Sequence, residues 1–590
     1  MKEFVKTMLA VICAFIVMQI LTFFFFMIML GSALVSGGSG KPLPKEGVLD
    51  INLSDFILTE QTQEASMPTF SGMSFSMPET SVGLWDAVRA IDAAAADPGV
   101  KCIFLRPEGA SGGMASIEEL RRALADFRKS GKPVVAWLES PGNGSYYLAT
   151  VADKVYLSAY KGGTYQLLGL STQLMFVKDI LDKVGVHVQL IRHGKYKSAG
   201  EMYIRNSASP ENREQNQVLI SSAWKNMSGA IAQARDIDEG NFNALVDNLS
   251  FVLPEDFLNA GLVDALLTRD QLKAKLCQLS GVASEEKLRL IPFADYTAAK
   301  VTPALRGNVA IIFADGEIVD GDDVQQIAGD RFAREIEKVT KDDAVKAVVL
   351  RVNSPGGSVS ASAKIRTALD SLKARKPLVA SFGNYAASGG YWISNGCEKI
   401  FADAGTVTGS IGVFSMIPEF SQVTKKVGVT FESVGSNKHS DMFGLMRPFD
   451  AAELNYMQAS VEDIYESFVN LVAQGRGMAP EAVDAIAQGR VWMATDGLEI
   501  GLVDEIGTLK DAVAYAASLA GLTMEQVTTV GYPKPLTVFE QLMETLGEGT
   551  EGPAILSGTP FESLESAVRK LDTSNPGVVL ARLPYAYDFR

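Results

Sequence analysis

Histidine and cysteine are scarce in this chain of 590 residues. It contains three histidines and four cysteines, and neither a Cys-x-x-Cys nor a His-Glu-x-x-His pattern occurs. Zinc sites of these common kinds are therefore not expected. Cys13 lies in an apolar run, and the three cysteines that remain are an odd number, so a disulfide framework is not expected either. The sequence predicts no metal ion and no cofactor.

Basic residues are also fewer than acidic ones. The chain has 54 Lys and Arg against 69 Asp and Glu, a formal net charge of -15. Nucleic-acid binding needs a basic face, so nucleic acid is not an expected partner. Because 47% of the residues are hydrophobic and 21% are charged, the composition is that of a folded globular protein. The length allows about two to four domains.

Long hydrophobic runs are confined to one place, residues 8–30. This run of 23 residues carries no charge, and about 20 apolar residues span a bilayer as a helix. Lys2 and Lys6 precede it and no basic residue follows until Lys41, which predicts a cytoplasmic segment 1–7 and a body outside the cytoplasm. A cleaved signal peptide is the alternative, but its apolar core is usually about 7–15 residues long.

The segments after this run are expected to be loose. Residues 31–46 contain Gly, Ser and Pro and are predicted to be a flexible linker between the anchor in the lipid and the body. Residues 65–80 are rich in Met, Ser, Pro and Phe. They are predicted to form a loop, with an adaptable apolar lip near the membrane as the alternative.

The body of the chain is a duplication. Three segments of the first half recur in the same order in the second half, at offsets of 245, 244 and 243 residues. They are Val100–Arg106 with Val345–Arg351, Lys132–Ala136 with Lys376–Ala380, and Lys183–Val186 with Lys426–Val429. We therefore expect two tandem repeats, at 47–303 and 304–540. A tail over 541–590 with one short helix near 561–571 follows.

Each repeat is predicted to have an α/β fold. In the second repeat, apolar runs at 309–313, 347–352, 378–382 and 399–402 are typical of buried parallel strands. Segments 330–339, 360–373 and 451–474 have helical periodicity, and the segment Gly489-Arg490-Val491-Trp492 follows them. This alternation of strands and helices indicates right-handed crossovers around a parallel sheet.

Two segments that follow expected strands carry possible chemistry. The first, Asn353–Ser358, contains Gly356 and Gly357, whose N–H groups could turn toward an oxyanion; a plain tight turn is the alternative. The second places Ser388 between two alanines and two glycines at a strand-to-helix turn. Small neighbours suit a nucleophile, although close packing of a helix on the sheet would also explain them.

A serine nucleophile needs a base. The second half offers His439, and the first half offers Lys195 and Lys197. A lysine acts as a base when burial lowers its pKa, but periodicity does not choose between these two, and a solvated basic edge is the alternative. From the residues alone the chain is an extracytoplasmic α/β protein with features of a serine hydrolase.

The same residues carry a family resemblance. The segments concerned are Asn353–Ser358, Tyr385–Trp392, Thr408–Gly412 and Tyr196–Ala199. With the anchor, they resemble the S49 family of membrane-anchored bacterial peptidases, in its long tandem-repeat form of signal peptide peptidases. The resemblance covers essentially the whole chain. It implies two tandem repeats of the Clp protease and crotonase type, placed after one N-terminal transmembrane helix.

The resemblance also implies roles for single residues. Ser388 would be the nucleophile, and Lys197 the general base, because Tyr196–Ala199 matches the lysine segment of the family. Gly356 or Gly357, with Gly389, would form the oxyanion hole. Ser410 would orient the lysine.

The family's activity and location are implied as well. We expect a serine endopeptidase that degrades apolar peptides, the remnant signal peptides left after preprotein processing. The chain would form a homotetramer in the bacterial inner membrane, anchored by one span, with its catalytic body in the periplasm.

The repeat predicts a single composite site. By the offsets above, the first-half counterpart of Ser388 is Gly144, and the second-half counterpart of Lys197 is Ser440. Each half has therefore kept one member of the pair, and the first-half glycine turn at 109–113 differs from the second-half turn. Two other functions stay open: a non-enzymatic membrane scaffold, which would tolerate Ser388→Ala, and a crotonase-like acyl-CoA enzyme, which would turn over CoA thioesters.

Overall fold

The structure is a computed structural model of the 590-residue chain. It describes residues 17–18, 43–63, 69–71, 74–76, 80–536, 540 and 577–583. Within these ranges no helix has the length and apolar character needed to cross a membrane. The expected anchor at 8–30 lies outside the described residues except for Val17 and Met18, as do most of the expected linker and the expected tail helix at 561–571.

A parallel sheet of six strands forms the core of the first half. Leu49 and Ile51 face helices α2 (Leu84–Ala96) and α3 (Met114–Arg128), whereas Val48 packs against α10 (Arg269–Ser280) on the other face. Because both faces are covered, most residues of these strands are apolar and buried. In spatial order the strands are β10 (Ala265–Leu267), β8 (Lys154–Ser158), β7 (Val134–Leu138), β6 (Val100–Arg106), β1 (Gly47–Asn52) and β11 (Leu290–Pro292).

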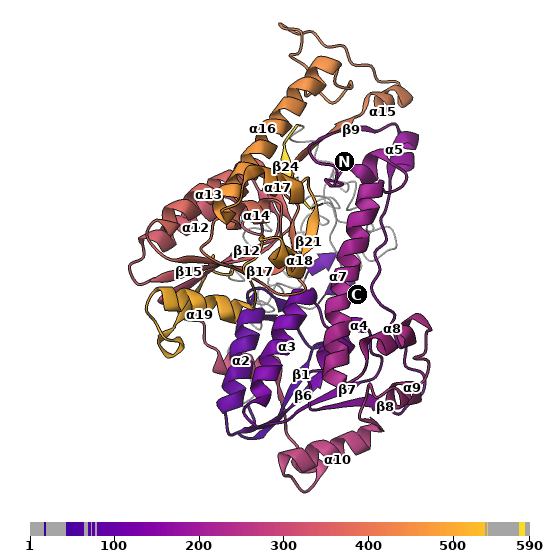
Figure 1. Ribbon diagram of the computed structural model, residues 1–590, viewed down its shortest axis with the longest axis vertical. Helices are drawn as coiled ribbons and strands as arrows, with labels where there is room; N and C mark the ends of the chain where they lie inside the picture. Colours follow the sequence, from indigo (N-terminus) through magenta and orange to yellow (C-terminus); the bar gives the residue numbers. More distant parts are fainter. Residues whose placement is uncertain are drawn as a thin grey trace, which may run out of the picture.

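The second half repeats this architecture. Helices α12 (Gly329–Lys341) and α13 (Val359–Lys373) cover one face of its sheet, and α19 (Leu509–Leu519) covers the other. The corresponding strands, in the same spatial order, are β22 (Glu505–Ile506), β18 (Ile400–Ala402), β17 (Leu378–Ala387), β15 (Ala347–Ser354), β12 (Val309–Asp315) and β23 (Thr529–Tyr532). The expected α/β fold and its duplication are thus confirmed (Figure 1).

The elements expected from the sequence of the second half are present within a few residues. The main difference is β17, which runs five residues beyond the expected end because Tyr385–Ala387 pairs with β19 (Val407–Gly409). Strand β19 in turn pairs antiparallel with β21 (Val491–Met493). Within the expected loop at 65–80, β3 (Thr69–Ser71) and β4 (Ser74–Ser76) form a short antiparallel pair.

A third sheet joins the two halves. Strand β9 (His187–Arg192) of the first half pairs antiparallel with β20 (Phe414–Glu419) of the second, over six residue pairs. The order of this sheet is β14 (Ile327–Ala328), β13 (Ile318–Val319), β16 (Gly356–Ser358), β24 (Leu580–Arg582), β20 and β9. Helix α7 (Pro210–Arg235) runs along both halves and packs against β21 (Figure 1).

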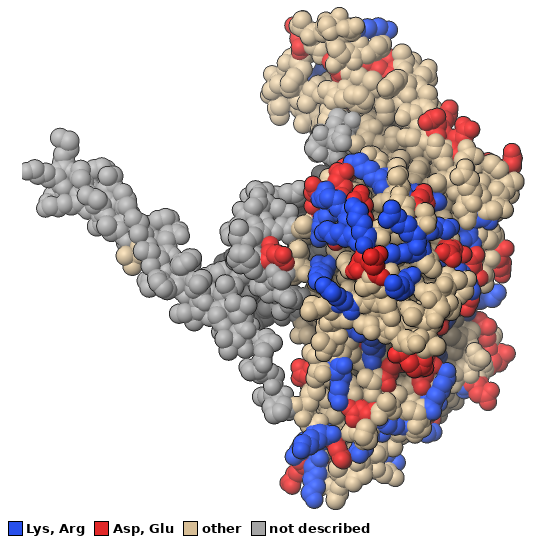
Figure 2. Space-filling view, turned by 90° about the vertical axis from the view of Figure 1, so that its left-hand side faces the viewer, with Lys and Arg blue, Asp and Glu red and all other residues tan. Residues whose placement is uncertain are grey.

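Buried charges also join the halves. Arg351 on β15 is 1% exposed, and its Nε lies 2.7 Å from Oε2 of Glu60 in the first half. Its Nη1 lies 2.6 Å from Oε1 of Glu119 on α3. Asp403, also fully buried, lies close enough to Glu119 to affect its pKa. On the outer face that carries α12 and α13, Lys and Arg side chains gather with some Asp and Glu among them (Figure 2).

Candidate active site

Ser388 lies at the turn between β17 and α14 (Gly389–Ser394). Its φ of 56° and ψ of -114° are unusual for a residue with a side chain, and such strain is often found at functional sites. Two hydrogen bonds hold this turn: the Ser388 N–H donates to Gly409 O at 2.8 Å, and the Trp392 N–H donates to Ser388 O at 2.8 Å. The turn directs the Ser388 hydroxyl toward the residues that follow β9.

Lys197 follows β9 and reaches Ser388 from the other half. Its Nζ lies 2.8 Å from Ser388 Oγ, 3.0 Å from Ser410 Oγ and 3.1 Å from the Ser410 carbonyl oxygen. Both Lys197 and Ser388 are fully buried. No carboxylate forms an ion pair with Lys197 among the described residues, and burial lowers the pKa of its ammonium well below the ordinary value.

This geometry suits proton transfer. An uncharged amine has a lone pair that can accept the proton of a hydroxyl, and 2.8 Å is an ordinary hydrogen-bond length. The two Ser410 oxygens accept the remaining Nζ protons and so fix the direction of the lone pair. The arrangement therefore has the parts of a nucleophile with its base.

The segment Gln488–Trp492 encloses Lys197. The Tyr196 N–H donates to Gln488 O at 2.9 Å, and the Ser410 N–H donates to Arg490 O at 2.6 Å. A Cβ on Gly489, where φ is +78°, would lie 2.6 Å from Lys197 Cβ, so that only glycine allows this approach. The guanidinium of Arg490 stacks between the rings of Tyr196 and Trp492, 4.8 and 4.5 Å from their centroids.

The sequence alone assigns no role to the Gly489–Trp492 segment. The structure shows that it forms one wall around the lysine. The signal in the sequence was a Gly-Arg pair shortly before an apolar strand, but the pattern alone does not say which distant residue the glycine will contact.

The segment Asn353–Ser358, called the glycine loop below, lies against the Ser388 turn. Gly356 and Gly357 are buried with φ of 96° and 157°, and a Cβ on Gly356 would lie 2.6 Å from the Gly389 nitrogen. The Gly356 N–H donates to Ser354 Oγ at 3.2 Å. Gly357 and Gly389 are therefore the better candidates for oxyanion donors among the three glycines expected from the sequence.

The other two candidate bases lie elsewhere. Lys195 is exposed, with its Nζ 5.1 Å from the centroid of the Tyr196 ring. The alternation along an extended chain places Lys195 and Lys197 alike, but the turn after β9 separates them. The structure thus chooses Lys197 as the lysine that contacts Ser388.

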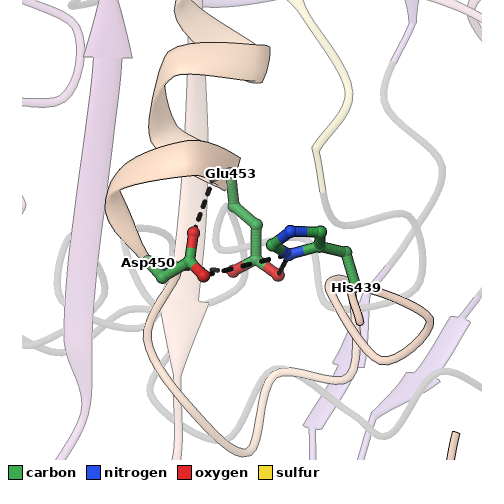
Figure 3. A group of neighbouring side chains, drawn as sticks. All are labelled: His439, Asp450 and Glu453. Carbon is green, nitrogen blue, oxygen red and sulfur yellow. Dashed lines mark hydrogen bonds and ion pairs between the residues drawn. The ribbon is translucent and has the colours of Figure 1, made fainter. Parts of the chain in front are cut away.

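His439 belongs to a separate group of charged residues at the start of α16 (Ala451–Arg476), shown in Figure 3. Its Nδ1 lies 2.9 Å from Glu453 Oε1 and 3.9 Å from Asp450 Oδ2. These three side chains have the ligand types of a metal site. Arg447, however, donates to both oxygens of Glu453 at 2.7 Å and holds the pKa of that carboxyl at about 2. A metal ion would have to displace Arg447, so we assign the group to the capping of α16.

The first half has no serine at the place of Ser388. Tyr146 donates to Leu262 O at 2.6 Å, and Tyr391 donates to Leu502 O at 2.9 Å, both fully buried. These matching hydrogen bonds pair Tyr391 with Tyr146, an offset of 245 residues, whereas the expected counterpart Gly144 assumes an offset of 244. The counterpart of Ser388 is accordingly Asn143, which corrects the expected Gly144.

Comparisons with known proteins identify relatives over most of the chain. The family model "Peptidase family S49" matches twice, at residues 126–283 and 370–523. "Protease 4" of Salmonella typhi is 36% identical over 544 residues, which cover 89% of this chain and 87% of that protein. "Protease 4" of Haemophilus influenzae is 34% identical over 523 residues, which cover 85% and 84% of the two chains.

A plant protein and one solved structure are also similar. "Serine protease SPPA, chloroplastic" of Arabidopsis thaliana is 30% identical over 472 residues, 78% of this chain and 69% of that protein. A solved ClpP1 mutant from Listeria monocytogenes is 15% identical, with a TM-score of 0.24, and the match covers 34% of this chain and 94% of that one.

Proposed function

Because this chain belongs to peptidase family S49, we propose that it is a serine endopeptidase in which Lys197 and Ser388 act as a catalytic dyad. The observation that carries this proposal is the 2.8 Å contact between Lys197 Nζ and Ser388 Oγ in a site without water-exposed surface. The repeat at 47–303 would supply the base, and the repeat at 304–540 the nucleophile. The two residues are 191 positions apart.

The chemistry follows from these contacts. The uncharged amine of Lys197 takes the Ser388 proton as Oγ attacks the carbonyl carbon of a peptide bond. The carbonyl oxygen gains negative charge and is stabilised by N–H groups of the glycine loop and of Gly389. Removing one such donor typically costs about 2.7–4 kcal/mol of transition-state stabilisation.

The protonated Lys197 next acts as an acid. Lys197 gives the proton to the leaving amine, and an acyl-enzyme ester remains on Ser388. The lysine, again uncharged, then takes a proton from a water molecule that attacks the ester. It gives this proton to Ser388 Oγ as the ester bond breaks and the carboxylic acid product leaves. Ser410 would keep Nζ aimed at Oγ through its two oxygens, at 3.0 and 3.1 Å.

The substrates we propose are the apolar remnants of signal peptides. The support is membership of a family whose relatives include proteins named Protease 4 and SPPA, together with the apolar run at 8–30. As a membrane anchor, this run would hold the body on the periplasmic side of the bacterial inner membrane, close to such peptides.

We further propose that the chain forms a homotetramer. Exposed apolar side chains on the segment after α15 (Ser421–Lys426) support self-association: Val427, Phe431 and Val434 are 71%, 57% and 97% exposed. Light scattering of the detergent-solubilised protein would give the mass of the assembly. A monomer mass would contradict this part of the proposal.

Hydrolysis of a fluorogenic apolar peptide amide tests the dyad. We expect the wild type to cleave it, and its kcat to rise with pH, because lysine is the base only after it loses its proton. Ser388→Ala and Lys197→Met should each abolish turnover. The matched control is Lys195→Met, which removes an exposed lysine two residues away and should leave kcat unchanged. If Lys197→Met cleaves as fast as Lys195→Met, the dyad is wrong. If the wild type cleaves no peptide, a non-enzymatic scaffold becomes the better assignment.

A further inference from the structure

Strand β24 fills a gap in the sheet beside the active site. It pairs antiparallel with β16 on one side, matching Gly356 with Arg582 and Gly357 with Ala581. On its other side it pairs antiparallel with β20 through Leu580. The Leu583 N–H also donates to Pro355 O at 2.7 Å. In Figure 1 it is the short yellow strand labelled β24.

The backbone of β24 lies against the glycines that flank Ser388. A Cβ built on Gly356 would collide with the carbonyl oxygen of Ala581, and one built on Gly389 would lie 3.1 Å from the same oxygen. A peptide carbonyl is thus already seated beside the candidate oxyanion donors. With β24 in place, the side chains of Ser388 and Lys197 have no exposed surface.

The side chains of β24 alternate as in a bound peptide strand. Ala581 is fully buried in the core of the second half, and Leu583 is 5% exposed in the core of the first half. Arg582, between them, forms an ion pair with Glu317 at 2.8 Å. The groove therefore holds one small side chain and, two residues later, one large apolar side chain.

We propose that β24 is a resident peptide ligand of the active site, bound where a substrate strand binds. The groove between β16 and β20 then accepts extended peptides with a small residue before the cleaved bond and an apolar residue two positions after the small one. While β24 is bound it competes with substrate, so the wild type keeps only about a tenth of the activity that it would have without β24. This inference rests on the proposed function, whose substrate preference it specifies.

The sheet around β24 supports displacement rather than a purely structural role. Strands β16 and β24 are three residues each, so their pairing is short. When β24 leaves, β16 and β20 each expose an unpaired edge, and such edges bind extended peptides by strand addition. The edge of β16 contains Gly356 and Gly357, and the edge of β20 belongs to the strand that pairs with β9. A peptide bound between these two edges therefore runs past Ser388 and Lys197.

Removal of β24 tests the proposal. One variant ends after residue 576, and a second, full-length variant carries Ala581→Arg, whose side chain does not fit the buried position. We expect kcat/KM for a fluorogenic peptide amide to rise about tenfold or more in both variants. This factor is the effective concentration of β24 in the chain, ~1 mM, divided by a dissociation constant of ~0.1 mM. Leu305→Arg, at a position that is 83% exposed, is the matched arginine control and should behave as the wild type.

A synthetic peptide of residues 577–583 supplies the second arm. Added to the truncated variant, it should inhibit competitively, whereas the same peptide with arginine in place of Ala581 should not. If both variants are folded by circular dichroism and hydrolyse the substrate no faster than the wild type, β24 is structural and the inference is overturned. Absence of inhibition by the peptide overturns it as well.

Labelling of Ser388 separates this inference from the proposed function. A small fluorophosphonate should label Ser388 in the truncated variant, as read by mass spectrometry of the peptide that contains it. If Ser388 is labelled but the truncated variant hydrolyses peptide no faster than the wild type, the inhibition by β24 is refuted and the proposed dyad is not. If Ser388 is not labelled in any variant, the proposed function fails, and the inference falls with it.

Discussion

Gly489→Ala is the sharpest test of how the lysine is held. The added Cβ would lie 2.6 Å from Lys197 Cβ and 2.7 Å from both its Cα and its nitrogen. These atoms belong to the main chain or are fixed to it, so no change of rotamer removes the collision. Lys197 must shift, or the Gln488–Trp492 segment must move away from it.

The magnitude has two parts. A φ of +78° costs an alanine about 1–2 kcal/mol, and overpacking a filled interior costs about 1–3 kcal/mol. The free energy of unfolding should therefore fall by about 2–5 kcal/mol. A displacement of the base by about 1 Å should also lower kcat about 100-fold.

Gly477→Ala isolates the first part. Gly477 ends α16 with a φ of +63°, and none of the described atoms lies within 4 Å of its ideal Cβ. The Gly477→Ala variant should lose about 1–2 kcal/mol of unfolding free energy and keep the kcat of the wild type. Urea denaturation and peptide hydrolysis measure both variants. Equal kcat and equal stability in the two would refute the argument that Gly489 positions Lys197.

Three further predictions concern single side chains in and beside the site. Ser410→Ala removes one of the two oxygens of Ser410 that accept from Lys197 Nζ. The kcat should therefore fall about 3- to 10-fold, the effect of losing one hydrogen bond, and KM should stay constant. A rise in KM larger than the fall in kcat would contradict this. Lys197→Met should be inactive but at least as stable as the wild type at neutral pH, because it removes a buried amine. The pKa of Lys197 in the folded protein lies below its unfolded value of about 10.4. At a pH between these two pKa values the lysine gains a proton when the protein unfolds, so the stability of the wild type should rise with pH in that window. Thermal unfolding of Lys197→Met should lack this rise. Burial and two neighbouring glutamates raise the pKa of Asp403 well above its ordinary value, so the wild type should lose stability as pH rises through that raised pKa. Asp403→Asn should remove this loss in urea denaturation across roughly pH 4 to 9.

The sequence predicts the architecture and singles out Ser388 because both depend on local patterns. The apolar run at 347–352 is buried on both faces of a sheet in the structure. Ser388 stands between small residues that a strand-to-helix turn of this shape requires. The internal repeat predicts two halves of similar fold, since similar sequence patterns form similar sheets.

What the sequence leaves open is decided by contacts between distant segments. Lys195 and Lys197 have equal chemistry, and only the docking of β9 on β20 determines which one is buried. Gly489 and Lys197 meet across the interface of the halves, so no local period links them. The pairing of β24 with three residues of the glycine loop has the same character, because a strand of three residues gives almost no signal of its own.

The proposed dyad is divided between the two halves, so catalysis by it would depend on their docking. In a chain whose halves are apart, Lys197 is in water, where lysine keeps its proton at neutral pH with a pKa of about 10.4. Ser388 then has no base. Docking brings β9 onto β20, closes Gly489 over the lysine and buries Arg351 between Glu60 and Glu119. The same step that desolvates the lysine delivers it to the serine, so the proposed protease gains its activity only when the fold is complete.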